Sequence, residues 1–178
     1  MANIKLNTRF GELEVDPSRI ITFPKGLPGF EDYKRWTLFH EINDKGEAVC
    51  GVVIHLQSLD NEKVTLSLTE PKLFGFNYEL VLTDSEVAEL KVESAHDVLV
   101  LATLSEKDVT ARALSSKDVV PKIYAPVSSE DVFANLTAPI LINIKSRIGM
   151  QKILIPGEAT IGFRTGIGAV DSSKVQQK

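Results

Sequence analysis

Residues 20–30 join the end of an apolar run to two Pro/Gly turns and an aromatic side chain, Phe30. Proline restricts φ and glycine reaches backbone conformations that other residues avoid, so Gly26, Pro28 and Gly29 fix the path of the chain. No nucleophile with a base, metal-binding cluster or phosphate-binding loop lies beside them. The segment therefore predicts a protein that works through its shape, by binding and not by catalysis.

Short apolar runs separated by turns fill most of the chain. Residues 4–15 predict a hairpin, because apolar and polar residues alternate on both sides of a turn that contains Gly11. The run 48–56 is apolar on both faces, as is typical of a central strand. The other predicted strands are residues 19–23, 36–40, 64–69, 98–104, 132–136, 140–144 and 151–155.

Helical signals are few. Residues 84–91 predict an α-helix, because Thr83 or Asp84 caps its start and Glu86 lies in its first turn. A shorter helical turn is predicted after Pro71. Together with the short strands, this pattern predicts a mainly β single domain, a barrel or a sandwich with one or two short helices. We expect the domain to span residues 1–156 and residues 157–178 to form a flexible C-terminal tail.

A short sequence pattern of the form apolar–Ser–x–charged–Asp–Val occurs three times, beginning at Leu104, Leu114 and Val127. One interpretation is three similar Ser/Asp turns, each leading into a strand. The other is a local duplication that inserted a hairpin near residues 105–130, whose edge offers a surface to a specific partner.

Composition and charge limit the classes of function. The 178 residues are 43% hydrophobic and 25% charged, with a net charge of −4 and a pI near 5.4. Nucleic-acid binding needs clustered Lys and Arg, so this balance argues against direct contact with nucleic acid. Cys50 is the single cysteine, which excludes an intrachain disulfide. No secretory signal or membrane-spanning apolar run is evident, so we expect a cytoplasmic protein that does not enter a membrane.

Candidate catalytic residues do not form a site. His40, His55 and His96 are far apart in sequence and lack the spacing of metal ligands. Cys50 lies in an apolar run and is predicted to be a small buried side chain. We therefore expect no enzymatic activity, no metal, no cofactor and no small-molecule substrate.

Four aromatic residues stand beside turns, outside regular strand alternation: Phe30, Phe74, Phe76 and Tyr78. They either fill the ends of a barrel or act as exposed anchors for a protein partner, since aromatic side chains supply much of the energy of protein interfaces.

Several spaced motifs together resemble the FliW family of flagellar assembly factors. The resemblance covers about residues 4–155, and its most specific parts are the 20–30 segment and the run Asn-Leu-Thr-Ala-Pro-Ile-Leu-Ile-Asn at 135–143. Three features depart from the family pattern: His55 where an aromatic is expected, a long connection between Leu104 and Asn135, and the tail. The other matching motifs are Phe10-Gly11, Leu-Gln-Ser-Leu-Asp at 56–60, Pro71-x-x-Phe74 with Tyr78, and Gln-Lys-Ile-Leu at 151–154.

The resemblance implies a small β-barrel-like protein that is not an enzyme. Members of this family bind flagellin in the cytoplasm and also bind CsrA, the RNA-binding repressor of flagellin translation. When export removes flagellin, the freed factor captures CsrA, so that translation follows secretion. The acidic composition agrees with a basic RNA-binding partner and with repulsion of RNA phosphates. An alternative function is an RNA-binding β-barrel, although the sequence lacks Lys/Arg interleaved with aromatics.

Two groups of residues are predicted to matter. We expect Asn135 and Asn143 to satisfy backbone groups around Pro139, because proline removes a strand donor. The predicted structural positions are Gly26, Pro28, Gly29, Asn135, Pro139 and Asn143, and the predicted partner contacts are Phe30, Gln57, Ser58, Tyr78 and Gln151.

Overall fold

The computed structural model describes residues 2–48, 53–74, 76–106, 124–126, 132–154, 159–165 and 168–170. Cys50 lies outside these residues, as do most of the predicted inserted hairpin and the side chains of Phe74, Phe76 and Tyr78. Predictions that concern them stay predictions.

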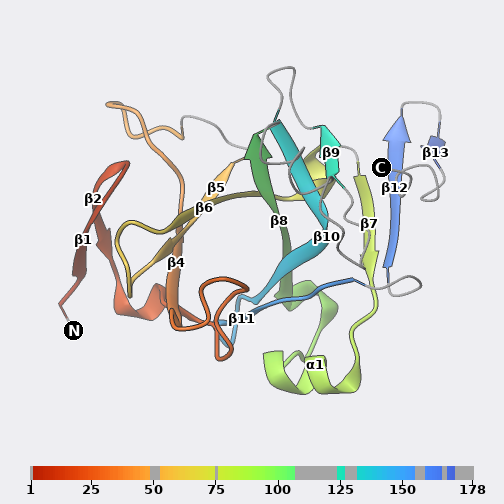
Figure 1. The fold of residues 1–178 in the computed structure, drawn as a ribbon, viewed down its shortest axis with the longest axis horizontal. Helices are drawn as coiled ribbons and strands as arrows, with labels where there is room; N and C mark the ends of the chain where they lie inside the picture. Colours follow the sequence, from red (N-terminus) through yellow and green to blue (C-terminus); the bar gives the residue numbers. More distant parts are fainter. Residues whose placement is uncertain are drawn as a thin grey trace.

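Seven strands close into a barrel, so the mainly β, barrel-like prediction is confirmed (Figure 1). All neighbouring pairs in it are antiparallel except β11 with β3, which run parallel. In order around the barrel, the strands are β3 (Ile21–Thr22), β4 (Arg35–Phe39), β5 (Ile54–Ser58), β6 (Thr65–Thr69), β8 (Val98–Glu106), β10 (Val132–Asn143) and β11 (Ile148–Gln151).

The predicted opening hairpin is confirmed as β1 (Ile4–Thr8) paired with β2 (Gly11–Val15). It forms a separate two-stranded sheet on one flank of the barrel, beside β4 (Figure 1). Leu6 and Val15 are buried on its inner face with Leu59, which follows β5. The hairpin is thus attached by a small apolar cluster of its own.

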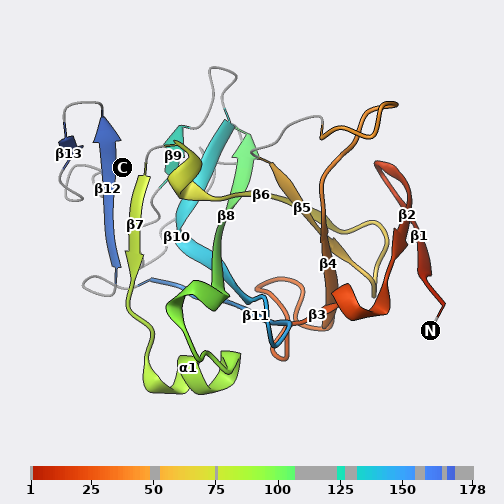
Figure 2. The same cartoon turned by 180° about the vertical axis from the view of Figure 1, so that it is seen from behind.

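Three strands lie on the other flank (Figures 1 and 2). β7 (Phe76–Leu80) pairs with β12 (Ala159–Thr165), and β12 pairs with β13 (Gly168–Val170). The short strand β9 (Tyr124–Pro126) pairs with the first part of β10. The structure thus places two strands within residues 157–178, and the division of the chain into a domain and a flexible tail stays a prediction.

The barrel interior is filled by apolar side chains from β3, β4, β5, β6, β8 and β10 and from the segment that follows β3. Each is at most 1% exposed, which stabilises the fold by about 1.5–3 kcal/mol for each large aliphatic or aromatic side chain. Trp36 lies among them, and its indole Nε1–H donates to the carbonyl of Tyr33 at 2.9 Å. The cluster consists of Ile21, Phe23, Leu27, Trp36, Leu56, Leu68, Leu101, Ile140 and Ile142.

Residues 132–136 and 140–144, predicted as two strands, belong to one long strand, β10. Its pairing with β8 changes register between Asn135 and Ile140, where four residues of β10 lie opposite one residue of β8. The intervening residues bulge around Pro139 and then return to the sheet, so the strand continues through the proline. The prediction of a break was wrong, because a bulge accommodates a proline within a strand.

The role predicted for Asn143 at Pro139 is also corrected. The buried Asn143 amide donates to the carbonyls of Leu90 and Lys91 at 2.8 and 3.0 Å, and its oxygen accepts from Lys145 N at 2.9 Å. It therefore joins the end of a helix to the turn after β10. Asn135 does act within the bulge, accepting from Thr137 N at 3.0 Å.

The predicted helix is confirmed as α1 (Asp84–Leu90), with Thr83 as its N-cap. The Thr83 hydroxyl accepts from Glu86 N at 3.2 Å, and the Glu86 carboxylate accepts from Thr83 N at 2.9 Å, which forms a capping box. A 3₁₀ turn at Pro71–Phe74 confirms the second helical signal. Two further 3₁₀ turns, Pro17–Arg19 and Ala95–Asp97, have no predicted counterpart.

Several strand limits differ from the predicted ones. β5 begins at Ile54 and runs to Ser58, whereas residues 48–56 were predicted. β11 spans Ile148–Gln151, earlier than the predicted 151–155. β3 contains only two residues because the preceding 3₁₀ turn and the following Pro24 shorten it.

Candidate functional site

The Pro/Gly corner, residues 24–29, leaves the barrel directly after β3 and returns as a tight loop. Gly26 has φ +66° and Gly29 has φ +85°, which are backbone conformations that favour glycine. A Cβ on Gly26 would lie 2.6 Å from backbone atoms of Glu31, so the two arms of the loop are in contact there. Leu27 and Phe30 exchange backbone hydrogen bonds, which closes the loop.

The aromatic residue after the corner points into the molecule. The Phe30 ring centroid lies 6.0 Å from that of Tyr33 and 6.3 Å from that of Trp36. Phe30 is partly buried and packs against the barrel core. Of the two interpretations offered for it, this position matches the filling of a barrel end, and a partner contact by Phe30 stays a prediction.

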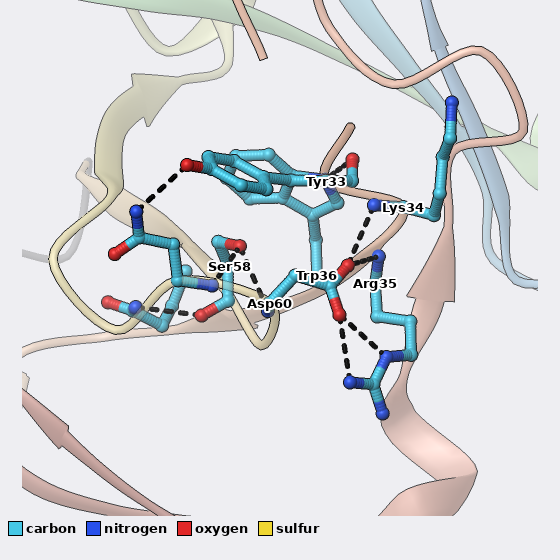
Figure 3. A network of polar contacts seen from close by, with 8 residues as sticks. Tyr33, Lys34, Arg35, Trp36, Ser58 and Asp60 are labelled. Atoms are coloured by element: carbon cyan, nitrogen blue, oxygen red, sulfur yellow. Dashed lines mark hydrogen bonds and ion pairs between the residues drawn. The ribbon is translucent and has the colours of Figure 1, made fainter. Parts of the chain in front are cut away.

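A polar network fixes the start of β4 to the turn between β5 and β6 (Figure 3). Asp60 accepts hydrogen bonds from Lys34 N and Arg35 N at 2.8 and 2.9 Å, and its other oxygen accepts from Arg35 Nε at 2.9 Å. Burial raises the pKa of Asp60, but these hydrogen bonds, that of Arg35 N foremost, hold it below its ordinary value. The carboxylate is therefore charged at neutral pH and fastens the turn between β5 and β6 to the start of β4.

Gln57 and Ser58, two predicted partner contacts, are both 0% exposed. The Ser58 hydroxyl accepts from Asp60 N and Asn61 N at 3.1 and 3.0 Å. The Gln57 amide donates to the carbonyls of Ser58 and Glu62 at 2.9 and 3.1 Å. Both side chains therefore organise the turn from within, and direct contact of either with a partner stays a prediction.

A groove of about 220 Å³ opens between the Pro/Gly corner, α1 and β11. It brings together three predicted residues that are distant in sequence, Gly26, Pro28 and Gln151. Figures 1 and 2 show the corner, α1 and β11 side by side at one end of the barrel. The remaining lining residues, which the sequence analysis missed, are Lys25, Glu31, Glu89, Gly149 and Met150.

Three charged side chains line this groove. Lys25 Nζ, from the corner, lies 3.2 Å from a carboxylate oxygen of Glu89 on α1. Glu31 Oε1 accepts from Gly29 N at 3.0 Å. That hydrogen bond lowers the pKa of Glu31, so the carboxylate is ionised at neutral pH. The groove therefore holds two carboxylates and one ammonium group.

The β11 side of the groove begins directly after the seam where the barrel closes. β3 and β11 pair at a single position, Thr22 against Ile148, and Thr22 N donates to the carbonyl of Arg147 at 2.9 Å. Beyond it the Phe23 ring packs on Gly149, where a Cβ would lie 2.4 Å from the ring. Residues 149–151 of β11 thus border the groove where β3 has already ended.

Gln151 has a structural contact as well as a place in the groove. Its side-chain amide donates to the carbonyl of Ala138 at 2.9 Å, within the bulge of β10. This is the bridge beside Pro139 that the sequence analysis assigned to asparagine. The Pro139 carbonyl in turn accepts from Lys152 N at 3.0 Å.

A second hollow, of about 160 Å³, lies between the hairpin tip and the end of β4. There the Phe10 ring covers His55 at a centroid distance of 4.3 Å, and Phe39 lies 5.2 Å from the same imidazole. Burial, and to a smaller extent the Arg9 charge, lowers the pKa of His55, so its imidazole is neutral at pH 7. His55 therefore packs as an aromatic side chain at the position where the resemblance predicts one.

Two features are absent from the part of the chain that the structure describes. Among the residues that the structure describes, no group of three or more His, Cys, Asp or Glu could hold a metal ion. Within the same residues, no helix is long and apolar enough to cross a membrane. Tyr78 is placed by its backbone on β7, opposite Ile161, and its predicted contact role stays untested.

Comparisons with known proteins agree on one family. The model of the FliW protein family matches residues 5–115. The flagellar assembly factor FliW of Azoarcus sp. (strain BH72) is 39% identical over 145 residues, which are 82% of this chain and 86% of the relative. That of Thermosipho africanus (strain TCF52B) is 32% identical over 151 residues, which are 85% of this chain and 88% of the relative.

A solved structure shows the same fold. The crystal structure of the flagellar assembly factor FliW superposes with a TM-score of 0.64 at 27% identity. The match covers 88% of this chain and 92% of the other. Sequence and structure comparisons therefore extend over most of the chain, and the family model includes the corner and α1.

Proposed function

Because the chain belongs to the FliW family of non-enzymatic flagellar assembly factors, we propose that it binds flagellin and the repressor CsrA in the cytoplasm. In this role it couples flagellin translation to export. Free flagellin occupies the factor, and when export lowers the flagellin concentration the factor captures CsrA and releases the messenger RNA. Such exchange is a linkage between two binding equilibria and needs no catalytic group.

The acidic groove between the corner, α1 and β11 is the observation that supports binding as the mode of action. Its volume is smaller than the roughly 300–1,000 Å³ of typical small-molecule sites. It is bordered by a loop whose path is set by glycine and proline, so its shape is defined before a partner arrives. Its charge suits a basic protein and repels phosphate.

Calorimetric titration of the full chain with flagellin and with CsrA from the same organism tests the proposal. We expect micromolar or tighter binding of each, and we expect flagellin to displace CsrA or to weaken its binding. If neither protein binds, the proposal is wrong.

A filter-binding titration with RNA separates this function from direct RNA binding. We expect no retention of RNA by the chain alone at any salt concentration. Retention that falls steeply as salt rises would instead indicate an RNA-binding barrel.

A further inference from the structure

We propose that the groove binds a lysine or arginine side chain of an extended partner segment, and that Lys25 occupies this position in the free protein. The proposal deepens the function proposed above and rests on it, because it assigns one kind of contact to that protein-binding role. The cationic side chain of the partner replaces Lys25 beside Glu89, and the backbone of the partner segment lies along residues 149–151 of β11.

The ion pair across the groove is asymmetric in exposure. The Lys25 side chain is 78% exposed, whereas that of Glu89 is 20% exposed. An ammonium group at the end of such an exposed stem is weakly held, since exposed ion pairs contribute little to stability. Glu89 is therefore a fixed, partly buried carboxylate, and Lys25 is a cation that can leave it without loss of the fold.

A second carboxylate makes the groove under-neutralised. Glu31 is held in place by the N–H of Gly29 and keeps its negative charge. Among the side chains that line the groove, Glu31 and Glu89 give two negative charges against the single positive charge of Lys25. Lys34, which does not line the groove, also acts on Glu31 through its charge. A partner cation that enters while Lys25 turns to solvent finds two carboxylates in the same hollow, which favours a guanidinium or ammonium group over a neutral side chain.

The backbone around the groove favours an extended segment. β11 pairs with β10 over all its four residues, but with β3 at Ile148 alone. Residues 149–151 therefore face the groove on the side where β3 has ended. Addition of a strand beside an incompletely paired one is a common mode of peptide recognition.

The groove's size selects a side chain and not a whole small molecule. A volume of about 220 Å³ suits one long side chain, while typical ligand pockets are larger. A helix would present its backbone buried behind its side chains and could not pair with residues 149–151. An extended segment with a single basic residue satisfies both the backbone and the carboxylates.

The first test uses ¹⁵N-labelled full chain and the acetylated, amidated peptide Thr-Val-Lys-Val-Thr. We expect chemical-shift changes at the amides of Gly26, Glu31, Glu89, Gly149 and Gln151, and weaker binding as salt rises. The peptide with Glu in place of Lys is the control and should cause no such changes. Absence of changes at these amides with millimolar peptide, or equal changes with the Glu peptide, overturns the proposal.

Matched variants test the exchange of cations. Glu89→Gln should weaken binding of the Lys peptide about tenfold, because a charge-assisted contact is lost. Lys25→Met should strengthen binding about 2- to 5-fold, because the internal competitor is gone. Glu93→Gln removes the same charge from an exposed residue that does not line the groove, and it should leave the affinity unchanged. An equal effect of Glu93→Gln and Glu89→Gln would show that the affinity for the peptide depends only on the net charge of the protein, and it would overturn the proposal.

The same three variants, titrated with flagellin and CsrA, distinguish a failure of the groove assignment from a failure of the proposed function. We expect at least one of these partners to follow the order seen with the peptide. If both bind the wild-type chain and neither responds to Glu89→Gln or Lys25→Met, the groove assignment fails while the proposed function stands. If neither binds the wild-type chain, the proposed function fails, and so does the assignment of the groove to that function.

Discussion

Gly26 and Gly29 share a positive φ but differ in their surroundings. A Cβ on Gly26 would overlap the backbone of Glu31, whereas a Cβ on Gly29 would meet no atom within 4 Å. Gly26→Ala should therefore lower the free energy of unfolding by about 3 kcal/mol or more, through both backbone strain and displacement of the loop. Urea unfolding followed by circular dichroism measures the change.

Gly29→Ala is the matched control for that prediction. It carries the strain of a positive φ without a steric overlap, and should cost about 1 kcal/mol. Equal losses in the two variants would show that the contact between the arms of the loop does not contribute.

His55 links stability to pH through its burial under Phe10 and Phe39. Because its pKa in the folded protein lies below the ordinary histidine value of 6.5, the unfolded chain binds the proton more readily. The free energy of unfolding has its full value at pH values above 6.5, where His55 is neutral in both states. It falls as the pH drops below 6.5 toward the pKa of His55 in the folded protein, because the unfolded chain takes up the proton first. We expect the midpoint of urea unfolding to decline from pH 7 to pH 5.

Two variants isolate this effect. His55→Gln should flatten the decline, since the titrating group is removed, while replacement of the exposed His96 by Gln should leave it unchanged. A decline of the same size in His55→Gln would assign the pH dependence to other groups.

At the scale of elements, one buried ion pair fastens α1 to the end of β11. Lys152 Nζ lies 2.7 and 2.9 Å from the two carboxylate oxygens of Glu86, and its side chain is 3% exposed. Burial raises the pKa of Glu86, but the bonds from Lys152 and Thr83 N bring it below its ordinary value. The same carboxylate thus completes the capping box and receives the lysine.

Lys152→Met should lower the free energy of unfolding by about 3 kcal/mol, because it leaves the Glu86 charge without its partner. Adding Glu86→Gln should restore part of the loss, since glutamine still accepts from Thr83 N and carries no charge. Lys5→Met, in an exposed pair with Glu12, should have almost no effect. Chemical unfolding of the wild type, the two single variants and the double variant measures these differences in the free energy of unfolding. No recovery in the double variant would contradict this explanation.

Elements whose signals are local were predicted well. The hairpin β1–β2 follows from alternation around Gly11, and α1 follows from its capping box. The strand β10 was divided in the prediction because a proline locally signals a break. Its continuity depends on β8 and β11, which supply partners on both sides of the bulge, and no local pattern contains that information.

The residues of the groove show the same limit. Gly26, Pro28 and Gln151 stood out as motif residues, and the fold brings them together. Gln57 and Ser58 stood out equally, yet both are buried, because a polar pair that organises a turn resembles a binding pair in sequence. Glu89 lies on an ordinary helix, and only the approach of α1 to the corner distinguishes it.

For the whole molecule, the seam between β3 and β11 is the weakest closure of the barrel. It has one residue pair, whereas β4 and β5 pair at four positions. We expect the Thr22 amide, which donates across the seam, to exchange with deuterium faster than the amides of Leu56 and Leu66 in the β5–β6 pair. Equal protection would mean that the barrel opens only as one cooperative unit.

Trp36 is an intrinsic fluorescence probe of the corner and of the barrel interior. It is the only tryptophan in the sequence, it is 0% exposed, and it touches the rings of Phe23 and Phe30 on either side of the corner. Its fluorescence therefore originates from a single, known point of the fold, with a blue-shifted spectrum while the interior stays dry. Any event that loosens the corner should shift that emission, so an unlabelled sample can report its own state in real time.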